Sequence, residues 1–449
     1  MKKNFKEIPG SVVAPKGLLA SGVFCDIKRL GTGKGSNRGQ KRDLALIVSE
    51  VPATVAGMFT TNQVCAAPVK VCIERVKKGV AQAIVANSGN ANACTGEQGL
   101  KDAREMTALV AKHLHMPAEH VLVGSTGRIG VKMPMANVRD GISEAVTLLD
   151  NSPESAAHAA EAIMTSDTRP KQIAVEFKLG VKTVRIGGIC KGAGMIQPGM
   201  SATGKRPAAF PLQRSNASTL HATMLCFITT DAVIEAKVLR TALQEAVAQS
   251  FNRITVDGDM STNDTVLALA NGLAQNRKFG IRNSEFGIFQ AALNHVCLEL
   301  AKMIVRDGEG VHRAVTVRVN GAKNFADADA AARAVANSPL VKTSWHGGDP
   351  NWGRIMDALG YSPAKIVEGK VDIGYSAVSS KKILWSLKRG QPTTVIFRQL
   401  CGAVAPKEFD LHINLNLGKA GAVIYAADLT EEYVDFNKGD VDDPASLGG

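Results

Sequence analysis

Three glycine-rich polar stretches lie directly beside apolar segments that predict strands. They are ANSGNANACTG at 86–96, VGSTGRIG at 123–130 and ICKGAGMIQPG at 189–199. Glycine lets the backbone approach another group closely, and successive backbone N–H groups in a turn can form an oxyanion hole. Tight turns between buried strands explain any one of these stretches equally well.

Three further loops concentrate carboxylates, amides and hydroxyls after apolar segments. They are SFNRITVDGDMSTNDT at 250–265, VRDGEG at 305–310 and HGGDPNWGR at 346–354. Asx turns and helix caps account for part of this composition. Because several such loops occur in one chain, we favour a polar pocket for a zwitterionic ligand.

Other motif-like features predict no chemistry. In GTGKGSNRGQK at 31–41, Gly35 follows Lys34 where a phosphate-binding loop needs Ser or Thr, so we expect a flexible basic surface loop. His113 and His115 lie two apart on a predicted helix and therefore point away from each other, which argues against a shared metal site. The eight cysteines include no CxxC pair and no zinc-ligand spacing, so we expect reduced thiols and no metal.

Strands and helices alternate around these loops. Apolar runs and period-two alternation predict strands at 45–49, 81–88, 223–232, 314–322, 370–377, 393–400, 411–418 and 420–430. Helical spacing of apolar residues predicts helices at 96–114, 154–164, 237–254 and 284–306. Periodicity alone therefore indicates a mixed α/β protein.

Composition narrows the class of protein. The 449 residues include 45% hydrophobic residues and 43 glycines, which is typical of a globular enzyme with one large domain or about two to three ordinary ones. The net charge of +12 is concentrated near 28–42 and 205–214, and the first cluster has no interleaved aromatic residues, which argues against nucleic-acid binding. No apolar leader and no run of eighteen apolar residues is present, so we expect a cytoplasmic enzyme and no membrane partner.

Taken in order, these segments closely resemble the ornithine acetyltransferase (bifunctional glutamate N-acetyltransferase) family of arginine biosynthesis. The resemblance spans nearly the whole chain. Its segments are APKG, DLALIVSEVPATVAGMFTTN, ANSGNANACTG, GSTG, MTSDTRPK, KGAGMIQP, ATMLCFITTDA, FNRITVDGDMSTNDT, VRDGEG, DPNWGRI and DLTEEYV.

The resemblance implies self-cleavage of the bond between Ala222 and Thr223, within LHATMLCF, to give chains 1–222 and 223–449. The threonine hydroxyl attacks the preceding carbonyl, an N-to-O acyl shift gives an ester, and hydrolysis frees a threonine with an α-amine. The reference pKa of such an amine is about 7.7 to 8.0, so it can deprotonate its own hydroxyl without a histidine.

The resemblance also implies a ping-pong transfer of acetyl from N-acetylornithine to Thr223 Oγ and then to glutamate. Thr126 and Gly127 match the family's oxyanion-stabilising positions. One such donor is typically worth about 10²- to 10³-fold in rate.

Matching by position further implies substrate binding by Thr165, Lys191, Thr223, Glu309 and Asn437. We hypothesise that Lys191 pairs with the α-carboxylate and Glu309 with an ammonium, because charge pairing supplies orientation. The resemblance implies no metal or organic cofactor. Bifunctional members also accept acetyl from acetyl-CoA, and the sequence leaves open whether this chain does.

The fold implied by the resemblance is a four-layer αββα sandwich of the N-terminal-nucleophile type, built from both cleavage products, with a smaller α/β domain within 240–400. By analogy, the expected assembly is a heterotetramer, α2β2.

Three segments depart from the family pattern, and the basic insertion at 29–42 is the mildest of them. An extra stretch at about 199–220 precedes the expected cleavage bond, and MSAT at 200–203 imitates the cleavage sequence, which makes Thr203 an alternative nucleophile. The tail KGDVDDPASLGG lacks the family's usual terminal Ser or Thr, so one substrate contact is expected to differ.

Two alternatives to the transferase remain at this stage. The first is an autoprocessed amidohydrolase or aminopeptidase of related fold, in which water deacylates the threonine ester. The second is an unprocessed, inactive relative that only binds amino acids.

Overall fold

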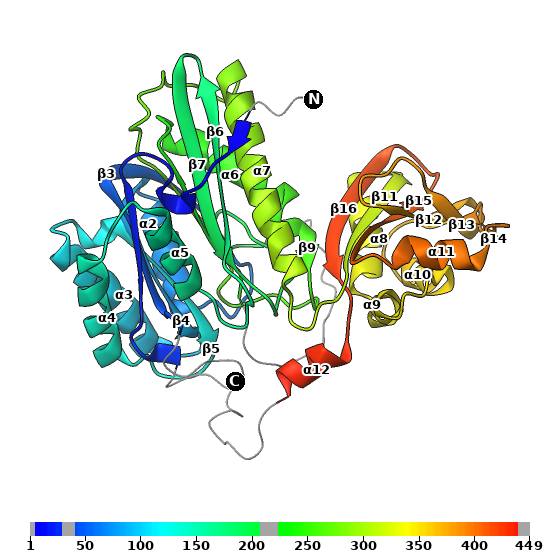
Figure 1. Cartoon of the computed structure of the whole chain (residues 1–449), viewed down its shortest axis with the longest axis horizontal. Helices are drawn as coiled ribbons and strands as arrows, with labels where there is room; N and C mark the ends of the chain where they lie inside the picture. Colours follow the sequence, from blue (N-terminus) through cyan, green and yellow to red (C-terminus); the bar gives the residue numbers. More distant parts are fainter. Residues whose placement is uncertain (1–4, 29–40, 207–222, 439–449) are drawn as a thin grey trace. The chain divides into compact units, whose positions relative to one another are not determined.

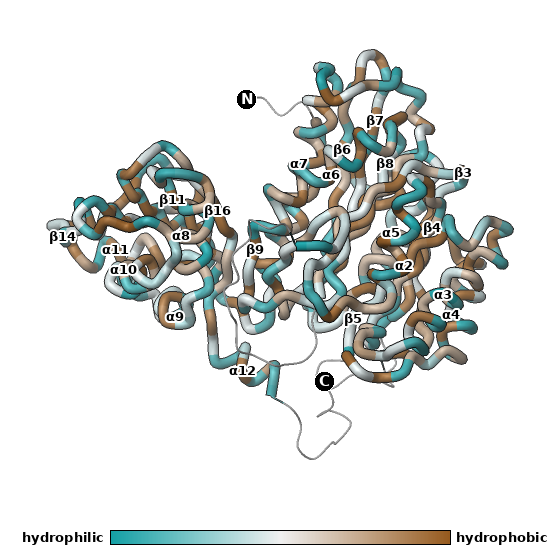
Figure 2. Tube along the Cα trace, turned by 180° about the vertical axis from the view of Figure 1, so that it is seen from behind, coloured by the Kyte–Doolittle hydropathy of each residue, from teal (hydrophilic) through white to brown (hydrophobic). Residues whose placement is uncertain are grey.

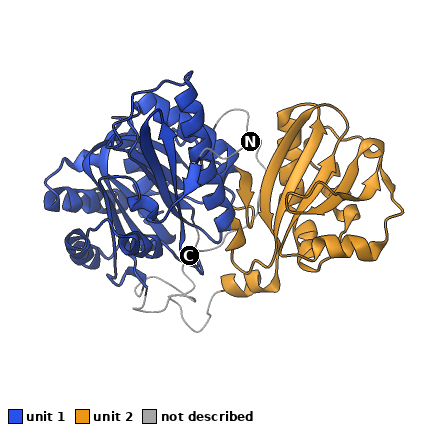
Figure 3. Ribbon diagram, turned by 45° about the horizontal axis from the view of Figure 1, so that its top comes forward, with its two compact units in different colours: residues 1–252, 260–304, 439–449 blue, residues 253–259, 305–438 orange. Residues whose placement is uncertain are grey.

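The computed structural model describes residues 5–28, 41–206 and 223–438. These residues form two compact units, which Figure 3 shows in different colours. Unit 1 contains residues up to 252 together with 260–304, and unit 2 contains residues 253–259 and 305–438. Residues 260–304, which fall inside the range expected for the smaller domain, therefore belong to unit 1.

Unit 1 is built on a sheet with nine strands among the described residues, in the order β1-β6-β7-β8-β10-β3-β4-β5, with β2 paired to β3 (Figure 1). The strands are β1 (Phe5–Glu7), β2 (Leu18–Val23), β3 (Leu44–Phe59), β4 (Val80–Asn90), β5 (Val121–Arg128), β6 (Lys171–Leu179), β7 (Lys182–Lys191), β8 (Leu225–Thr230) and β10 (Thr265–Ala270). The central strand β8 is parallel to β10 and antiparallel to β7. Segments on both sides of residue 222 therefore share one sheet.

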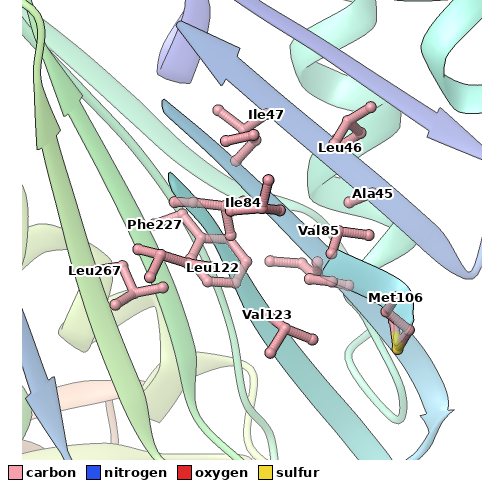
Figure 4. Packing of buried hydrophobic residues seen from close by; sticks show 14 of the residues in the cluster. Ala45, Leu46, Ile47, Ile84, Val85, Met106, Leu122, Val123, Phe227 and Leu267 are labelled. Carbon is pink, nitrogen blue, oxygen red and sulfur yellow. The ribbon is translucent and has the colours of Figure 1, made fainter. Parts of the chain in front are cut away.

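The two halves of this sheet pack face to face. The long strand β3 pairs with β4 through its first part and with β10 through its last part, so it runs through both halves. Figure 4 shows Phe227 and Leu267 from the β8–β10 half against Ile84 and Leu122 from β4 and β5. All four side chains are at most 1% exposed. The strands accordingly contain mainly apolar residues (Figure 2).

Helices cover the outer face of each half. They are α2 (Ala67–Val76), α3 (Gly96–His113), α4 (Met135–Thr147) and α5 (Pro153–Ala162) on one side and α6 (Ala236–Gln249) and α7 (Ser284–Arg306) on the other. Helix α5 shows how the sequence sets a boundary, because Ser152 Oγ accepts from Ser155 N–H and a proline occupies the first turn. The helix–sheet–sheet–helix order confirms the αββα expectation.

Helix α7 is long and apolar enough to cross a membrane by length and composition alone. In the structure 56% of that apolar window is buried, and Val296 and Leu300 pack over Gly188 of β7. Helix α7 is therefore a core helix of this fold.

Unit 2 has a second sheet in the order β14-β13-β12-β15-β11-β16-β9. Its strands are β9 (Ile254–Thr255), β11 (Ala314–Ala322), β12 (Asp372–Ala377), β13 (Leu384–Lys388), β14 (Gln391–Pro392), β15 (Glu408–Asn414) and β16 (Ala420–Ala427). Its helices are α8 (Phe325–Asn337), α9 (Pro339–His346), α10 (Trp352–Gly360), α11 (Phe397–Val404) and α12 (Glu431–Asn437). Short 3-10 helices are η1 (Ser11–Val13), η2 (Ala118–His120), η3 (Phe251–Arg253) and η4 (Glu368–Lys370).

One predicted strand is wrong. The segment 393–400 contains no strand, and helix α11 begins at Phe397. Leu400 and Val404 are buried four residues apart, whereas Ile396 and Phe397 are exposed. The buried side chains thus follow helical spacing, which overrides the local preference of β-branched residues for strands. The other predicted strands and all four predicted helices are present, with shifted ends.

Candidate functional site

Thr223 lies two residues before β8, a strand in the middle of the larger sheet. The backbone around it is fixed because Met224 N–H donates to Asp264 Oδ1 at 3.0 Å and Thr265 N–H donates to the Met224 carbonyl at 3.1 Å. Thr223 is 3% exposed. The alternative, Thr203, lies in an exposed turn where its hydroxyl accepts from Lys205 N–H. Ala222 lies outside the described residues.

The Thr223 hydroxyl contacts a second buried hydroxyl, that of Ser261. The two Oγ atoms are 2.6 Å apart, and Ser261 is fully buried. Ser261 Oγ also accepts from Asn263 N–H at 3.1 Å, and the Ser261 carbonyl accepts from Thr60 Oγ at 2.7 Å. The turn before β10 therefore holds Ser261 against Thr223.

The same turn is tied to the end of β5. Asn263 Nδ2 donates to the Ser125 carbonyl at 2.9 Å and to the Ala91 carbonyl at 2.7 Å. Thr223 is thus linked to the GSTG segment through two residues of one turn, Ser261 and Asn263. The structure thereby brings together three segments that the sequence analysis singled out separately.

Thr126 and Gly127, at the end of β5, have the geometry of a tightly built corner. Thr126 is fully buried, and its hydroxyl has no hydrogen-bond partner within the described part of the chain. Gly127 has φ +128°, and a Cβ there would lie 2.3 Å from the Gly89 carbonyl carbon. Only glycine fits, because both the backbone angle and the space exclude a side chain. A buried hydroxyl without a partner is available to donate to a ligand oxygen.

Lys191 and Thr165, two of the predicted substrate-binding residues, contact each other. Lys191 Nζ donates to Thr165 Oγ at 2.7 Å and lies 3.6 Å from Asp167 Oδ2. The fully buried Asp167 carboxylate also accepts from Lys171 Nζ at 2.6 Å and from Gly192 N–H at 2.7 Å. Burial by itself would raise the pKa of Asp167, but the two ammonium groups and this N–H hold that pKa below its ordinary value.

The position of Lys191 in the sheet places it at the same end as Thr223. Lys191 is the last residue of β7 and pairs with Leu225, two residues after Thr223. The lysine is 0% exposed. A buried ammonium at this end can orient an anionic group relative to the Thr223 hydroxyl.

Glu309 and Asn437, the other predicted substrate-binding residues, contact each other in unit 2. Asn437 Nδ2 donates to Glu309 Oε2 at 2.9 Å and to the Tyr433 carbonyl at 2.9 Å. Burial, together with nearby Asp257 and Glu309, raises the pKa of Tyr433. This corner is therefore suited to a cationic group.

Among the described residues, no group of three His, Cys, Asp or Glu side chains could hold a metal ion. All eight cysteines lie in the described ranges and are free thiols there. His113 ends α3, and both it and His115 are exposed. Most of the basic loop, residues 29–40, and Arg214 lie outside the described residues.

Sequence patterns alone do not single out Ser261, Asn263 or Asp167. Ser261 and Asn263 lie in the polar loop at 250–265 and Asp167 lies in MTSDTRPK, so the composition of these segments is a usable signal. The sequence does not show which residues they contact, because Ser261 reaches Thr223 only through the parallel pairing of β8 and β10.

The ArgJ family model matches residues 22–439. The chain is 45% identical over 430 residues to the arginine biosynthesis bifunctional protein ArgJ of Symbiobacterium thermophilum, covering 96% of this chain and 98% of that protein. It is 44% identical over 436 residues to a glutamate N-acetyltransferase of Methanocaldococcus jannaschii, with coverage of 96% and 98%. Among solved structures, the ornithine acetyltransferase of Mycobacterium tuberculosis complexed with ornithine is 35% identical, with a TM-score of 0.40 and coverage of 44% of this chain and 100% of that chain.

Proposed function

The chain belongs to the ArgJ family, and on that premise we propose that it transfers acetyl from N-acetyl-L-ornithine to L-glutamate through an acetyl-Thr223 intermediate. It is an acyltransferase of cyclic arginine biosynthesis. The structural observation that carries the proposal is the buried Thr223, whose hydroxyl contacts Ser261. Asn263 of the same turn donates to the carbonyl of Ser125, which precedes Thr126 and Gly127.

The first half-reaction follows from that placement. The freed α-amine of Thr223 takes the hydroxyl proton as Oγ attacks the acetyl carbonyl, and the carbonyl electron pair moves onto its oxygen. The Thr126 hydroxyl and the Gly127 N–H are the donors that we assign to this oxyanion. The Thr126 hydroxyl is buried and has no hydrogen-bond partner among the described residues, which supports this assignment. Collapse of the intermediate releases ornithine, whose amine takes the proton back.

The second half-reaction runs in the opposite direction with another amine. Glutamate enters the vacated site, its α-amine attacks the acetyl ester, and N-acetylglutamate leaves while Thr223 regains its proton. We assign Lys191 to the α-carboxylate that both amino acids share, because its buried ammonium lies at the Thr223 end of β7. We assign Glu309, with Asn437, to an ammonium group of the substrate.

The aminopeptidase alternative is not favoured, because the curated relatives at 44–45% identity are named for arginine biosynthesis and glutamate acetyl transfer. We propose that the reaction needs no metal or organic cofactor, with acetyl-CoA as a second acetyl donor to be tested directly. We further propose a cytoplasmic α2β2 assembly of the two cleaved chains, 1–222 and 223–449.

Cleavage and transfer can be tested with one pair of variants. Intact mass and N-terminal sequencing of the purified protein should show a chain beginning at Thr223. Thr223→Ala should remain uncut and lose at least about 10³-fold in kcat. Thr203→Ala is the matched control, because it removes the exposed threonine of the cleavage-like sequence and should change neither result.

The acceptor is tested by measuring ornithine release from N-acetylornithine with and without glutamate. We expect release to depend on glutamate and N-acetylglutamate to form in equal amount. Release that is unaffected by glutamate would identify a hydrolase. Cleavage before residue 203 instead of 223, with activity retained by Thr223→Ala, would move the nucleophile to the inserted segment.

A further inference from the structure

We propose that Ser261 is the hydrogen-bond donor that orients the Thr223 hydroxyl and stabilises the negative charge that develops on Thr223 Oγ during acyl transfer. The inference rests on the proposed function, because it assigns Thr223 as the nucleophile. It adds a second hydroxyl to the chemistry at that atom.

The contact between the Thr223 and Ser261 hydroxyls is close, and the backbone of Ser261 is fixed in place. The two Oγ atoms are 2.6 Å apart, and both side chains are at least 97% buried, so water does not compete for the bond. The Ser261 backbone is fixed by Thr60, whose hydroxyl donates to the Ser261 carbonyl at 2.7 Å. The serine is therefore preorganised and does not reach Thr223 by a chance rotamer.

The direction of the bond follows from the chemistry on each side. The α-amine of Thr223 must receive the Thr223 hydroxyl hydrogen, so that hydrogen points toward the amine and Oγ accepts from Ser261. Asn263 N–H in turn donates to Ser261 Oγ at 3.1 Å. The result is a chain of donors, from Asn263 N–H to Ser261 O–H to Thr223 Oγ, which polarises the serine hydroxyl toward the reacting oxygen.

Ser261 keeps its proton in this scheme. The hydrogen that Thr223 Oγ loses goes to the α-amine, the new bond joins Oγ to the acetyl carbon, and the broken bond is the substrate amide. Ser261 only strengthens its hydrogen bond while Oγ carries developing charge. Removing such a donor should slow the chemical step and leave substrate affinity unchanged.

The contact has a separate consequence for self-cleavage. Before the cut, the nitrogen of Thr223 is part of an amide and cannot act as a base, so the threonine hydroxyl has to be activated without it. Ser261 is then the polar side chain observed in contact with the Thr223 hydroxyl. We therefore expect loss of Ser261 to slow precursor cleavage as well as acetyl transfer.

The test compares Ser261→Ala with Ser250→Ala. Ser250 is also a buried serine of unit 1, 1% exposed, and its hydroxyl donates to the Ala246 carbonyl at 2.6 Å, away from Thr223. Both variants lose one buried hydroxyl. Ser261→Ala removes the hydrogen bonds with Thr223 and Asn263, and Ser250→Ala removes the one to Ala246. Ser261→Ala should lower kcat for glutamate-dependent transfer on the order of 10- to 100-fold, with KM for both substrates within about twofold of wild type. Ser250→Ala should keep kcat, although it lowers the melting temperature.

Precursor cleavage is followed by intact mass during a cell-free expression time course. Cleavage slowed at least about tenfold in Ser261→Ala but not in Ser250→Ala supports the proposal. If Ser261→Ala does not fold, Ser261→Cys carries the test, since a thiol is a weaker donor of similar size, and kcat should still fall about tenfold.

Cleavage and kcat that both stay within twofold of wild type in the folded variant overturn the proposal for Ser261. A rise in KM of about 10- to 100-fold without a change in kcat also overturns the proposal, because that pattern indicates a substrate contact. The proposed function fails by a different result, namely transfer activity that survives Thr223→Ala. The two failures are therefore distinguishable in the same set of proteins.

Discussion

Substituting Gly127 by alanine should damage both stability and catalysis, and the structure gives the reason for each. A residue with φ +128° costs about 1 to 3 kcal/mol when it carries a side chain. The added Cβ would also lie 2.3 Å from the Gly89 carbonyl carbon and 2.5 Å from Asn90 N, which are backbone atoms of the paired strand β4. Strands β4 and β5 must separate there, so we expect a total loss of about 3 to 5 kcal/mol.

The matched control is Gly180→Ala. Gly180 has φ +58° in the turn between β6 and β7, and a Cβ there would have nothing within 4 Å. It should show the backbone cost alone, about 1 kcal/mol. At about 2 to 4 °C per kcal/mol, we expect melting temperatures about 2 to 4 °C lower for Gly180→Ala and at least about 6 °C lower for Gly127→Ala.

Measurements of kcat distinguish an effect on the active site from an effect on stability alone. Moving the Gly127 N–H by a few tenths of an ångström weakens an oxyanion donor, so kcat of Gly127→Ala should fall about 10²- to 10³-fold at a temperature where the protein is fully folded. Gly180→Ala should retain wild-type kcat. Our account of this corner is refuted if the two variants melt within about 2 °C of each other and both keep kcat.

Two further predictions concern pH. Because the pKa of Asp167 is held below its ordinary value of 3.8, the ionised carboxylate stabilises the fold above pH 4, and this contribution is lost as the pH falls. At pH 7, Asp167→Asn should therefore be less stable than wild type by about 3 to 5 kcal/mol and melt at a clearly lower temperature. The difference in melting temperature should narrow below pH 4. Burial lowers the pKa of Lys342 to about 8, so between pH 8 and 10.5 the unfolded chain binds more protons than the folded one. Wild type should therefore gain stability relative to Lys342→Met as the pH rises through that window. A difference in melting temperature between the two proteins that stays constant with pH would contradict this assignment.

Local sequence patterns predicted the elements of the fold well where the buried side chains follow the same period as the strand or helix. Strands β3, β4 and β8 were predicted on a different ground, because a sheet covered on both faces buries nearly every side chain and leaves a short apolar run in the sequence. The segment 393–400 failed because tertiary packing buries Leu400 and Val404 and leaves Ile396 exposed. No local pattern shows which of those apolar residues will find a partner.

The candidate site shows the same division between local and non-local information. Thr126, Gly127 and Thr223 came from the family resemblance, and the structure supplies their surroundings. The pairing of Lys191 with Thr165, and of both with Asp167, requires the end of β7 to lie beside a loop some 25 residues earlier in the chain. Ser261 needs the β8–β10 adjacency, which depends on strand order in space and not on spacing in sequence.

The place of β8 inside its sheet also determines how a nicked molecule behaves. One neighbour, β7, would come from the first product, whereas the other, β10, would come from the second, so the ladder from Ile186 and Thr230 to Lys191 and Leu225 crosses between polypeptides. Separating the two polypeptides would remove β8 from the interior of the sheet and expose the apolar residues that pack against Phe227. The halves should consequently co-purify in equal amounts, separate only in denaturant, and aggregate when either is produced alone.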